Sequence, residues 1–169
     1  PLMIHMPGLE NAGTRIDAIT ESIDVTPTIL DWIGAEIPNS MDGRSLVPML
    51  QGATPGDWRT YSFSELDFGN SSDPNARQRA LGTTPSDSCF CILRDDRFNL
   101  VEFAADLPPL LFDRQGKWEA ENVAEKPEYA QDLMRLTRQL LRHRMRNADH
   151  TLSLFEITND GPKMTKRFT

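Results

Sequence analysis

The sequence has 169 residues, of which 38% are hydrophobic and 25% are charged, so we expect a packed core of ordinary globular composition. Its 18 basic and 25 acidic residues give a formal charge of −7, which argues against nucleic acid as a partner. No apolar run approaches the ~20 residues that span a bilayer, so we expect no membrane partner and a cytoplasmic location.

The N-terminal run predicts a strand of a larger sheet. Residues 1–6 read Pro-Leu-Met-Ile-His-Met and precede the breaker Pro7-Gly8, as in a buried strand that ends at a turn. Because the run starts at Pro1 without a methionine, we expect the chain to begin inside that strand. We interpret His5 as a strand residue, with a metal ligand as the alternative.

A short helix is predicted next. Asp24 or Thr26 offers an N-cap oxygen, and Pro27 suits the first helical position. Gly34 stands where a glycine often ends a helix. The apolar face consists of Ile29, Leu30, Trp32 and Ile33.

The middle of the chain predicts an antiparallel sheet. Tyr61–Phe68 reads as a strand that puts Tyr61, Phe63 and Glu65 on one face. Cys89–Phe103 reads as a hairpin that turns over residues 94–97, and a further strand is expected at residues 107–113.

Residues 69–88 lie between two of these strands and are rich in Ser, Asn, Asp, Pro and Gly. They predict a long loop or mobile insertion with a short interruption at residues 76–81. Loops of this length are often functional.

Two pairs of residues in the hairpin are candidates for chemistry. Asp95-Asp96 could be catalytic carboxylates, but aspartates in turns commonly hydrogen-bond their own backbone, which is our interpretation. Cys89 and Cys91 share a strand face, and we interpret them as reduced, half-buried residues rather than metal ligands or nucleophiles.

The longest predicted helix runs from Pro127 to about Asn147. Its apolar stripe is Tyr129, Leu133, Leu136 and Leu140, widened by Met134, Thr137, Leu141 and Met145. Arg138, Arg142, Arg144 and Arg146 crowd its end, where the helix dipole favours cations. We interpret them as a solvated face, with a phosphate or nucleic-acid patch as the alternative.

The C-terminal tail, residues 148–169, contains an alternating apolar run at residues 149–157 and a turn at Asp160-Gly161. A tail strand of this kind must cover its own domain or a neighbouring subunit, so contact within a homo-oligomer is a hypothesis.

Several motifs occur in a characteristic order. Residues 24–31 fit D-x-x-P-T-[IL]-L-D, residues 42–50 fit D-G-x-S-L-x-P-x-L, and residues 107–113 fit L-P-P-x-L-[FY]-D. Together they resemble the late part of the sulfatase and phosphonate monoester hydrolase branch of the alkaline-phosphatase-like hydrolases. The resemblance implies an α/β parent. This chain would be α+β: a last strand and helix of the large sheet, then a small antiparallel sheet backed by a C-terminal helix.

The resemblance also implies chemistry located outside this chain. In that family, a divalent metal and a formylglycine made from Cys or Ser cleave sulfate, phosphonate or phosphate esters. No C-x-P-x-R motif is found here. We therefore assign no catalytic, cofactor-binding or metal-binding residue to this chain. The implied partners are an N-terminal catalytic segment, a small-molecule ester and further copies of the chain.

Three parts are expected: residues 1–52 as the end of the catalytic α/β domain, 53–147 as an α+β subdomain, and 148–169 as an extended tail. The predicted function is the non-catalytic C-terminal part of a metal-dependent hydrolase, with structural, cleft-lining and assembly roles. The alternative is an independent protein-interaction module that binds a partner through its arginine-rich helix and apolar tail.

Overall fold

The computed structural model describes residues 2–9, 11–53, 55–70, 72–116, 118–147 and 155–164. The α-helices are α1 (Val25–Trp32), α2 (Val47–Leu50), α3 (Ala76–Leu81) and α4 (Ala130–Asn147). The strands are β1 (Ser62–Asp67), β2 (Cys89–Arg94), β3 (Phe98–Phe103), β4 (Leu110–Asp113), β5 (Phe155–Thr158) and β6 (Gly161–Met164). Short 3₁₀ turns are η1 (Ser22–Asp24), η2 (Pro85–Asp87), η3 (Trp118–Ala120) and η4 (Pro127–Tyr129). Within the described residues, no helix is long and apolar enough to cross a membrane.

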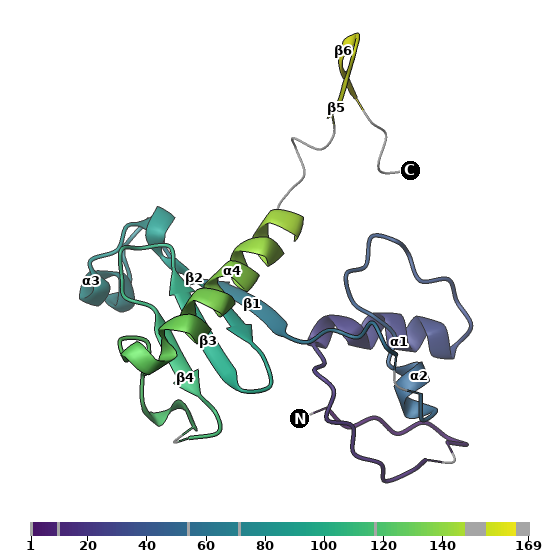
Figure 1. The fold of residues 1–169 in the computed structure, drawn as a ribbon. Helices are drawn as coiled ribbons and strands as arrows, with labels where there is room; N and C mark the ends of the chain where they lie inside the picture. The colour runs from purple at the N-terminus through teal and green to yellow at the C-terminus, as the bar shows by residue number, and fades with distance from the viewer. Residues whose placement is uncertain are drawn as a thin grey trace.

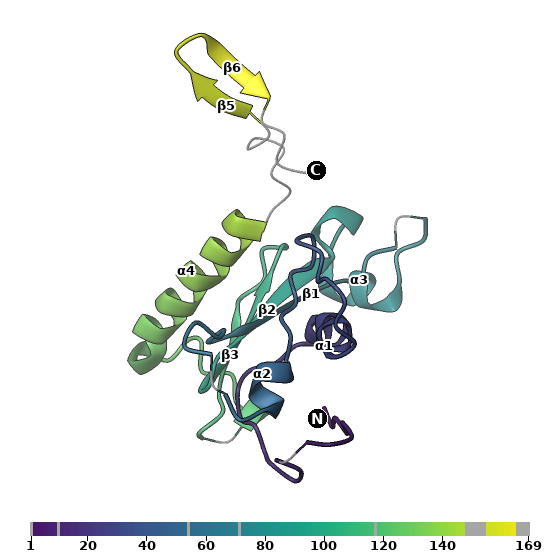
Figure 2. The ribbon, with the colours of Figure 1, turned by 90° about the vertical axis from the view of Figure 1, so that its right-hand side faces the viewer.

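Strands β1 to β4 form a four-stranded antiparallel sheet in the order β1-β2-β3-β4. Helix α4 crosses the face of this sheet that is turned to the viewer in Figure 1, and α1 and α2 lie beyond the edge strand β1. Figure 2 shows the same arrangement from the side, with α4 covering one face. This confirms the α+β prediction of a small antiparallel sheet backed by a C-terminal helix.

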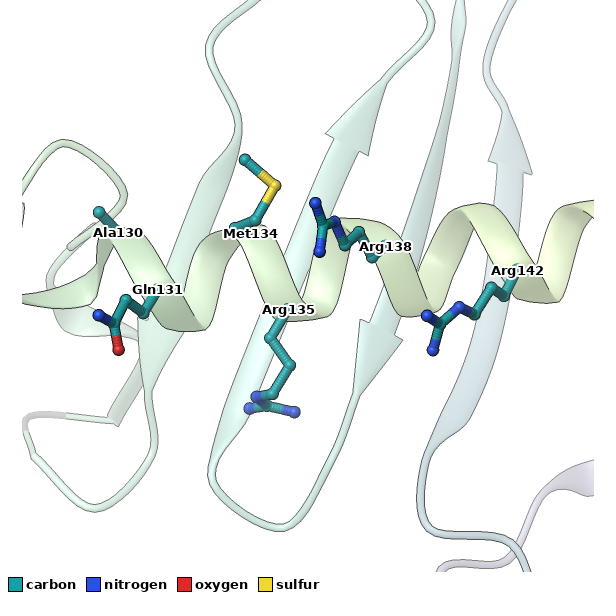
Figure 3. A pocket seen from close by; sticks show the side chains of 6 residues that line it. All are labelled: Ala130, Gln131, Met134, Arg135, Arg138 and Arg142. Carbon is teal, nitrogen blue, oxygen red and sulfur yellow. The ribbon is translucent and has the colours of Figure 1, made fainter.

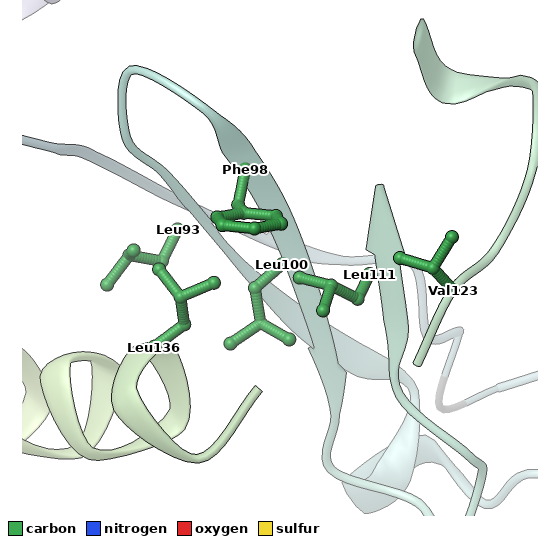
Figure 4. Packing of buried hydrophobic residues seen from close by; sticks show 6 residues of the cluster. All are labelled: Leu93, Phe98, Leu100, Leu111, Val123 and Leu136. Atoms are coloured by element: carbon green, nitrogen blue, oxygen red, sulfur yellow. The ribbon is translucent and has the colours of Figure 1, made fainter. Parts of the chain in front are cut away.

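The core lies between α4 and the sheet (Figure 4). Its buried members are Leu93, Phe98, Leu100, Leu111, Val123 and Leu136. Tyr129, Leu133 and Leu140 pack against them, as the predicted helical stripe requires. The predicted widening of that stripe is wrong at Met134, Leu141 and Met145, which are more than half exposed. Met134 and Leu141 each follow a sheet-facing residue by one position, which turns the side chain about 100° away, and Met145 follows His143 by two positions, about 200° away.

The N-terminal segment differs from its prediction. Residues 2–6 have no strand structure, because no described strand lies beside them to supply hydrogen bonds. Helix α1 begins at Val25, so Pro27 is its third residue rather than its first. Asp24 precedes the helix, but its side chain makes no capping hydrogen bond to α1.

Residues 69–88 are more ordered than a plain loop. Asn75 caps α3 by accepting hydrogen bonds from the backbone N–H groups of Arg77 and Gln78 at 2.9 and 3.0 Å. Gly82 ends the helix in the left-handed conformation, with φ of 66°. The short interruption predicted at residues 76–81 is therefore this capped helix.

In the C-terminal region, β5 and β6 form a separate two-stranded sheet, and Gly161 follows the turn with φ of 100°. The turn predicted there is confirmed. Most of the predicted tail strand, residues 149–154, lies outside the described residues, as do residues 148 and 165–169.

Leu136→Ala is expected to lower the free energy of unfolding by about 2–5 kcal/mol, because the variant leaves a cavity in the core. Leu136 is 0% exposed, whereas Leu141 on the same helix is 56% exposed. Leu141→Ala is the matched control and should change the value by about 0.5 kcal/mol or less. Urea denaturation measures both, and equal losses would contradict this assignment of the core.

Candidate functional site

The first motif is organised around a buried carboxylate, that of Asp24, which is 0% exposed. Arg59 approaches it with both terminal nitrogens and donates to both oxygens, at 2.7 Å for Oδ1. Backbone N–H groups of Glu21 and Arg44 donate to the same carboxylate at 2.8 and 2.9 Å. Each oxygen therefore accepts two hydrogen bonds, one from the guanidinium and one from the backbone.

The second motif packs directly onto the first. The Thr28 hydroxyl donates to the Asp24 carbonyl at 2.6 Å and accepts the backbone N–H of Leu46 at 2.9 Å. Gly43 leaves room for this approach, since a Cβ at that position would overlap the carbonyl oxygen of Ile23. The Ser45 hydroxyl donates to the carboxylate of Asp31. The two motifs thus form one hydrogen-bonded unit, which explains their residue types structurally.

The same unit is fastened to the sheet. Glu21 pairs with Arg59 at 3.4 Å and accepts the backbone N–H of Phe63, in β1, at 2.8 Å. The indole of Trp58 donates to the Ile19 carbonyl at 2.7 Å. Its ring lies 4.7 and 5.0 Å from the guanidinium carbons of Arg44 and Arg59, within cation–π range.

A cleft opens beside this junction, with a volume of about 580 Å³. We call it the His143 cleft. It is lined from α4, β1, the segment that leads into β1 and the segments around η1 and Gly43, and its lining includes Glu21, Asp42, Tyr61, Phe63, Glu65 and His143. Phe63 and Glu65 share one face of β1, as predicted, and they contact α4 together with Tyr61, which directly precedes the strand.

His143 joins helix α4 to strand β1. Its ring stacks on Phe63 with the centroids 4.1 Å apart, and its Nδ1 lies 3.2 Å from the Tyr61 hydroxyl. Burial lowers the pKa of His143, although the nearby carboxylates of Glu21, Glu65 and Asp42 act in the opposite direction and Arg144 reinforces the decrease. The imidazole is therefore neutral at physiological pH.

Sequence reasoning did not single out His143, because one histidine in an arginine-rich helix end gives no motif. A usable signal existed. His143 continues the sheet-facing series of Leu136 and Leu140 at the i+3 position, where a side chain must meet the sheet.

The other candidates take structural positions. Asp95 accepts the backbone N–H groups of Arg97 and Phe98 at 2.9 and 2.6 Å, which confirms its interpretation as a turn residue. Cys89 and Cys91 are free and half-buried, also as expected. Burial raises the pKa of the Cys91 thiol, with Glu65 acting in the same direction and Arg144 against it, so the thiol is not an activated nucleophile.

Three arginines of α4, Arg135, Arg138 and Arg142, line a shallow pocket of about 460 Å³ on its outer side (Figure 3). Arg138 and Arg142 are exposed and have no hydrogen-bond or ion-pair partner within the described part of the chain. Arg144 pairs with Glu65. This fits a solvated face.

Among the described residues, no group of three or more His, Cys, Asp or Glu side chains could hold a metal ion. The divalent metal implied by the resemblance thus has no ligand set among these residues.

Asp24→Asn is expected to lower the free energy of unfolding by about 3–5 kcal/mol, because it removes the buried charge that both terminal nitrogens of Arg59 bind and leaves this guanidinium only the longer contact with Glu21. Asp57→Asn is the control, since Asp57 pairs with Arg44 at the surface, where an ion pair contributes little to stability. Chemical denaturation compares the two, and similar losses would contradict the central role of Asp24.

A pH effect accompanies this pair. Burial raises the pKa of Asp24, but hydrogen bonds from Arg59, Arg44 and Glu21 outweigh burial, and the net pKa lies below 3.8. The stabilisation that the ionised Asp24 contributes is therefore complete above the pKa of this group in the unfolded chain. It is lost as the pH falls through the pKa of Asp24 in the folded protein.

His143 should make the protein less stable in mild acid. Because its folded pKa lies below the ordinary 6.5, the unfolded chain binds the proton more tightly, and stability falls as the pH drops below about 6.5. His143→Phe should reduce the loss of unfolding free energy between pH 7.5 and 5.5. His5→Phe, at an exposed residue, is the control, and an unchanged pH dependence in His143→Phe would be evidence against the effect.

Comparison with known proteins places these observations in a family. The family described as "N-sulphoglucosamine sulphohydrolase, C-terminal" matches residues 1–146. The chain is 37% identical over 163 residues to the multifunctional alkaline phosphatase superfamily protein PehA of Trinickia caryophylli. The aligned region covers 95% of this chain and 31% of PehA. It is 31% identical over 143 residues to an N-acetylglucosamine-6-O-sulfatase of Bacteroides thetaiotaomicron, over 80% of this chain and 24% of the relative.

Among solved structures, the phosphonate monoester hydrolase SpPMH of Silicibacter pomeroyi is 60% identical, with a TM-score of 0.76 over 91% of this chain and 30% of SpPMH. The phosphonate monoester hydrolase of Agrobacterium radiobacter is 34% identical, with a TM-score of 0.71 over 89% of this chain and 30% of that enzyme. The chain thus spans less than a third of the length of these relatives. It belongs to the N-sulphoglucosamine sulphohydrolase C-terminal family, within the sulfatase and phosphonate monoester hydrolase group of alkaline-phosphatase-like proteins.

Proposed function

We propose that this chain is the C-terminal part of a divalent-metal-dependent hydrolase of sulfate esters, phosphonate monoesters or phosphodiesters. The names of its relatives support this reaction class, since they include sulfatases and phosphonate monoester hydrolases. The catalytic residues and the metal belong to the remaining part of the protein. This chain contributes structure, a wall of the substrate cleft at residues 69–88 and, through residues 148–169, assembly into a homo-oligomer.

The observation that carries the non-catalytic role is the use of the motif residues. Asp24 and Arg59 satisfy one another in a buried site, and Arg44 donates to the Asp57 carbonyl and carboxylate at 2.8 and 2.9 Å. A carboxylate whose two oxygens both accept hydrogen bonds from the protein has little capacity left to bind a metal or accept a proton. These side chains hold the fold together.

A second observation supports docking onto the rest of the protein. Helix α1 exposes Ile29, Trp32 and Ile33, at 51%, 49% and 69%. Ile29 and Ile33 are four residues apart, so they lie on one face of the helix. They form an apolar surface suited to burial against a neighbouring layer.

The test uses the full-length protein with Ile29→Asp combined with Ile33→Asp. We expect metal-dependent hydrolysis of p-nitrophenyl phenylphosphonate or p-nitrophenyl sulfate by the wild type. The variant should lose about 3 kcal/mol or more of unfolding free energy, because two carboxylates enter an apolar contact. Activity should fall in proportion to the folded fraction.

The matched control is Leu141→Asp, which changes an exposed residue on α4 and should leave stability and activity close to those of the wild type. An α1 variant that behaves like this control would contradict docking through α1. Metal-dependent hydrolysis by the 169-residue chain alone would contradict the absence of a catalytic centre from this chain.

A further inference from the structure

The His143 cleft has more negative than positive charge. Its lining includes the four carboxylates of Glu21, Asp42, Asp57 and Glu65 but only two guanidinium groups, those of Arg44 and Arg59. Both guanidiniums already have carboxylate partners, Arg44 in Asp57 at the surface and Arg59 in Asp24 and Glu21. Few hydrogen-bond donors are left for a ligand.

The acceptors in the cleft are less fully used. In the part of the chain that the structure describes, the Asp42 carboxylate is exposed and has no hydrogen-bond or ion-pair partner. Glu65 pairs with Arg144 through one oxygen, Oε2, and this pair is about half exposed on both sides. The cleft therefore offers carboxylate oxygens to whatever enters it.

Aromatic rings complete the lining. Tyr61, Phe63 and His143 meet at one wall, where the Tyr61 and His143 rings are in edge contact at 5.7 Å and Phe63 stacks on His143. The volume of about 580 Å³ is within the range of small-molecule sites, roughly 300–1,000 Å³. Carboxylates beside aromatic rings favour a cation with an apolar shell, and they disfavour anions.

We propose that the His143 cleft binds an organic ammonium cation, held by the Asp42 and Glu65 carboxylates against the aromatic rings of Tyr61 and Phe63. This proposal stands apart from the hydrolase function, since it rests on side chains that all belong to this chain. A bare metal ion is a poorer fit, because no three-ligand group exists among the described residues.

Calorimetric titration of the full-length protein with choline tests this proposal, and 3,3-dimethyl-1-butanol serves as the uncharged isostere. Sodium chloride keeps the ionic strength equal in both titrations. We expect choline to bind about tenfold or more tightly than the alcohol, because only choline carries the charge that the carboxylates and rings attract.

Three variants locate the site. Asp42→Asn should weaken choline binding about five- to tenfold, and Phe63→Leu about threefold, because they remove the nearest charge and one aromatic ring. Asp73→Asn is the matched control, since Asp73 lies in the 69–88 segment and pairs with Arg79. Thermal unfolding of each variant verifies that it is folded.

Each result decides the proposal. Tighter binding of choline than of the alcohol, weakened by Asp42→Asn but not by Asp73→Asn, supports it. Equal binding of the two compounds, no measurable binding, or choline binding that Asp42→Asn leaves unchanged overturns it.

Discussion

The buried ion pair between Asp24 and Arg59 holds together three segments that are far apart in the sequence. It joins the start of α1, the loop at Gly43-Arg44 and the segment that enters β1. A buried charge is tolerated only when it is paired and hydrogen-bonded. Both oxygens of Asp24 meet that condition, and loss of Arg59 would leave the buried Asp24 carboxylate without a charged partner between these segments.

The position of the sheet relative to α1 follows from this pair. Arg59 also contacts Glu21, whose carboxylate accepts the backbone N–H of Phe63. The edge strand β1 is thus fixed to the motif through one arginine and one glutamate. Because His143 packs on Phe63, helix α4 is held in the same network, and the His143 cleft lies where these elements meet.

The ionisable residues of the two motifs have a structural role here. Asp24, Asp31, Arg44 and Ser45 would suit a catalytic site by residue type alone, yet their side chains are engaged with one another or with nearby backbone. This structural use agrees with membership of a C-terminal domain family. Relatives such as PehA and SpPMH are about three times longer than the region that they share with this chain. The exposed apolar face of α1 and the exposed arginines of α4 give the molecule two surfaces of different chemistry.

The sequence alone determined the local elements and the family. Local strand and turn patterns predicted β1, β2 and β3 and placed Phe63 and Glu65 on one face of β1, and the 3.6-residue period predicted the core stripe of α4, because such patterns depend only on neighbouring residues. The order of the motifs along the chain indicated the sulfatase-like group, because that order resembles the one in this family. Tertiary structure decided what involves distant partners: the absence of a strand at residues 2–6, the exposure of Met134 and Leu141, the pairing of Asp24 with Arg59 across 35 positions, and the contact of His143 with Tyr61 across 82. These depend on which segments meet in space, and no local pattern contains that information.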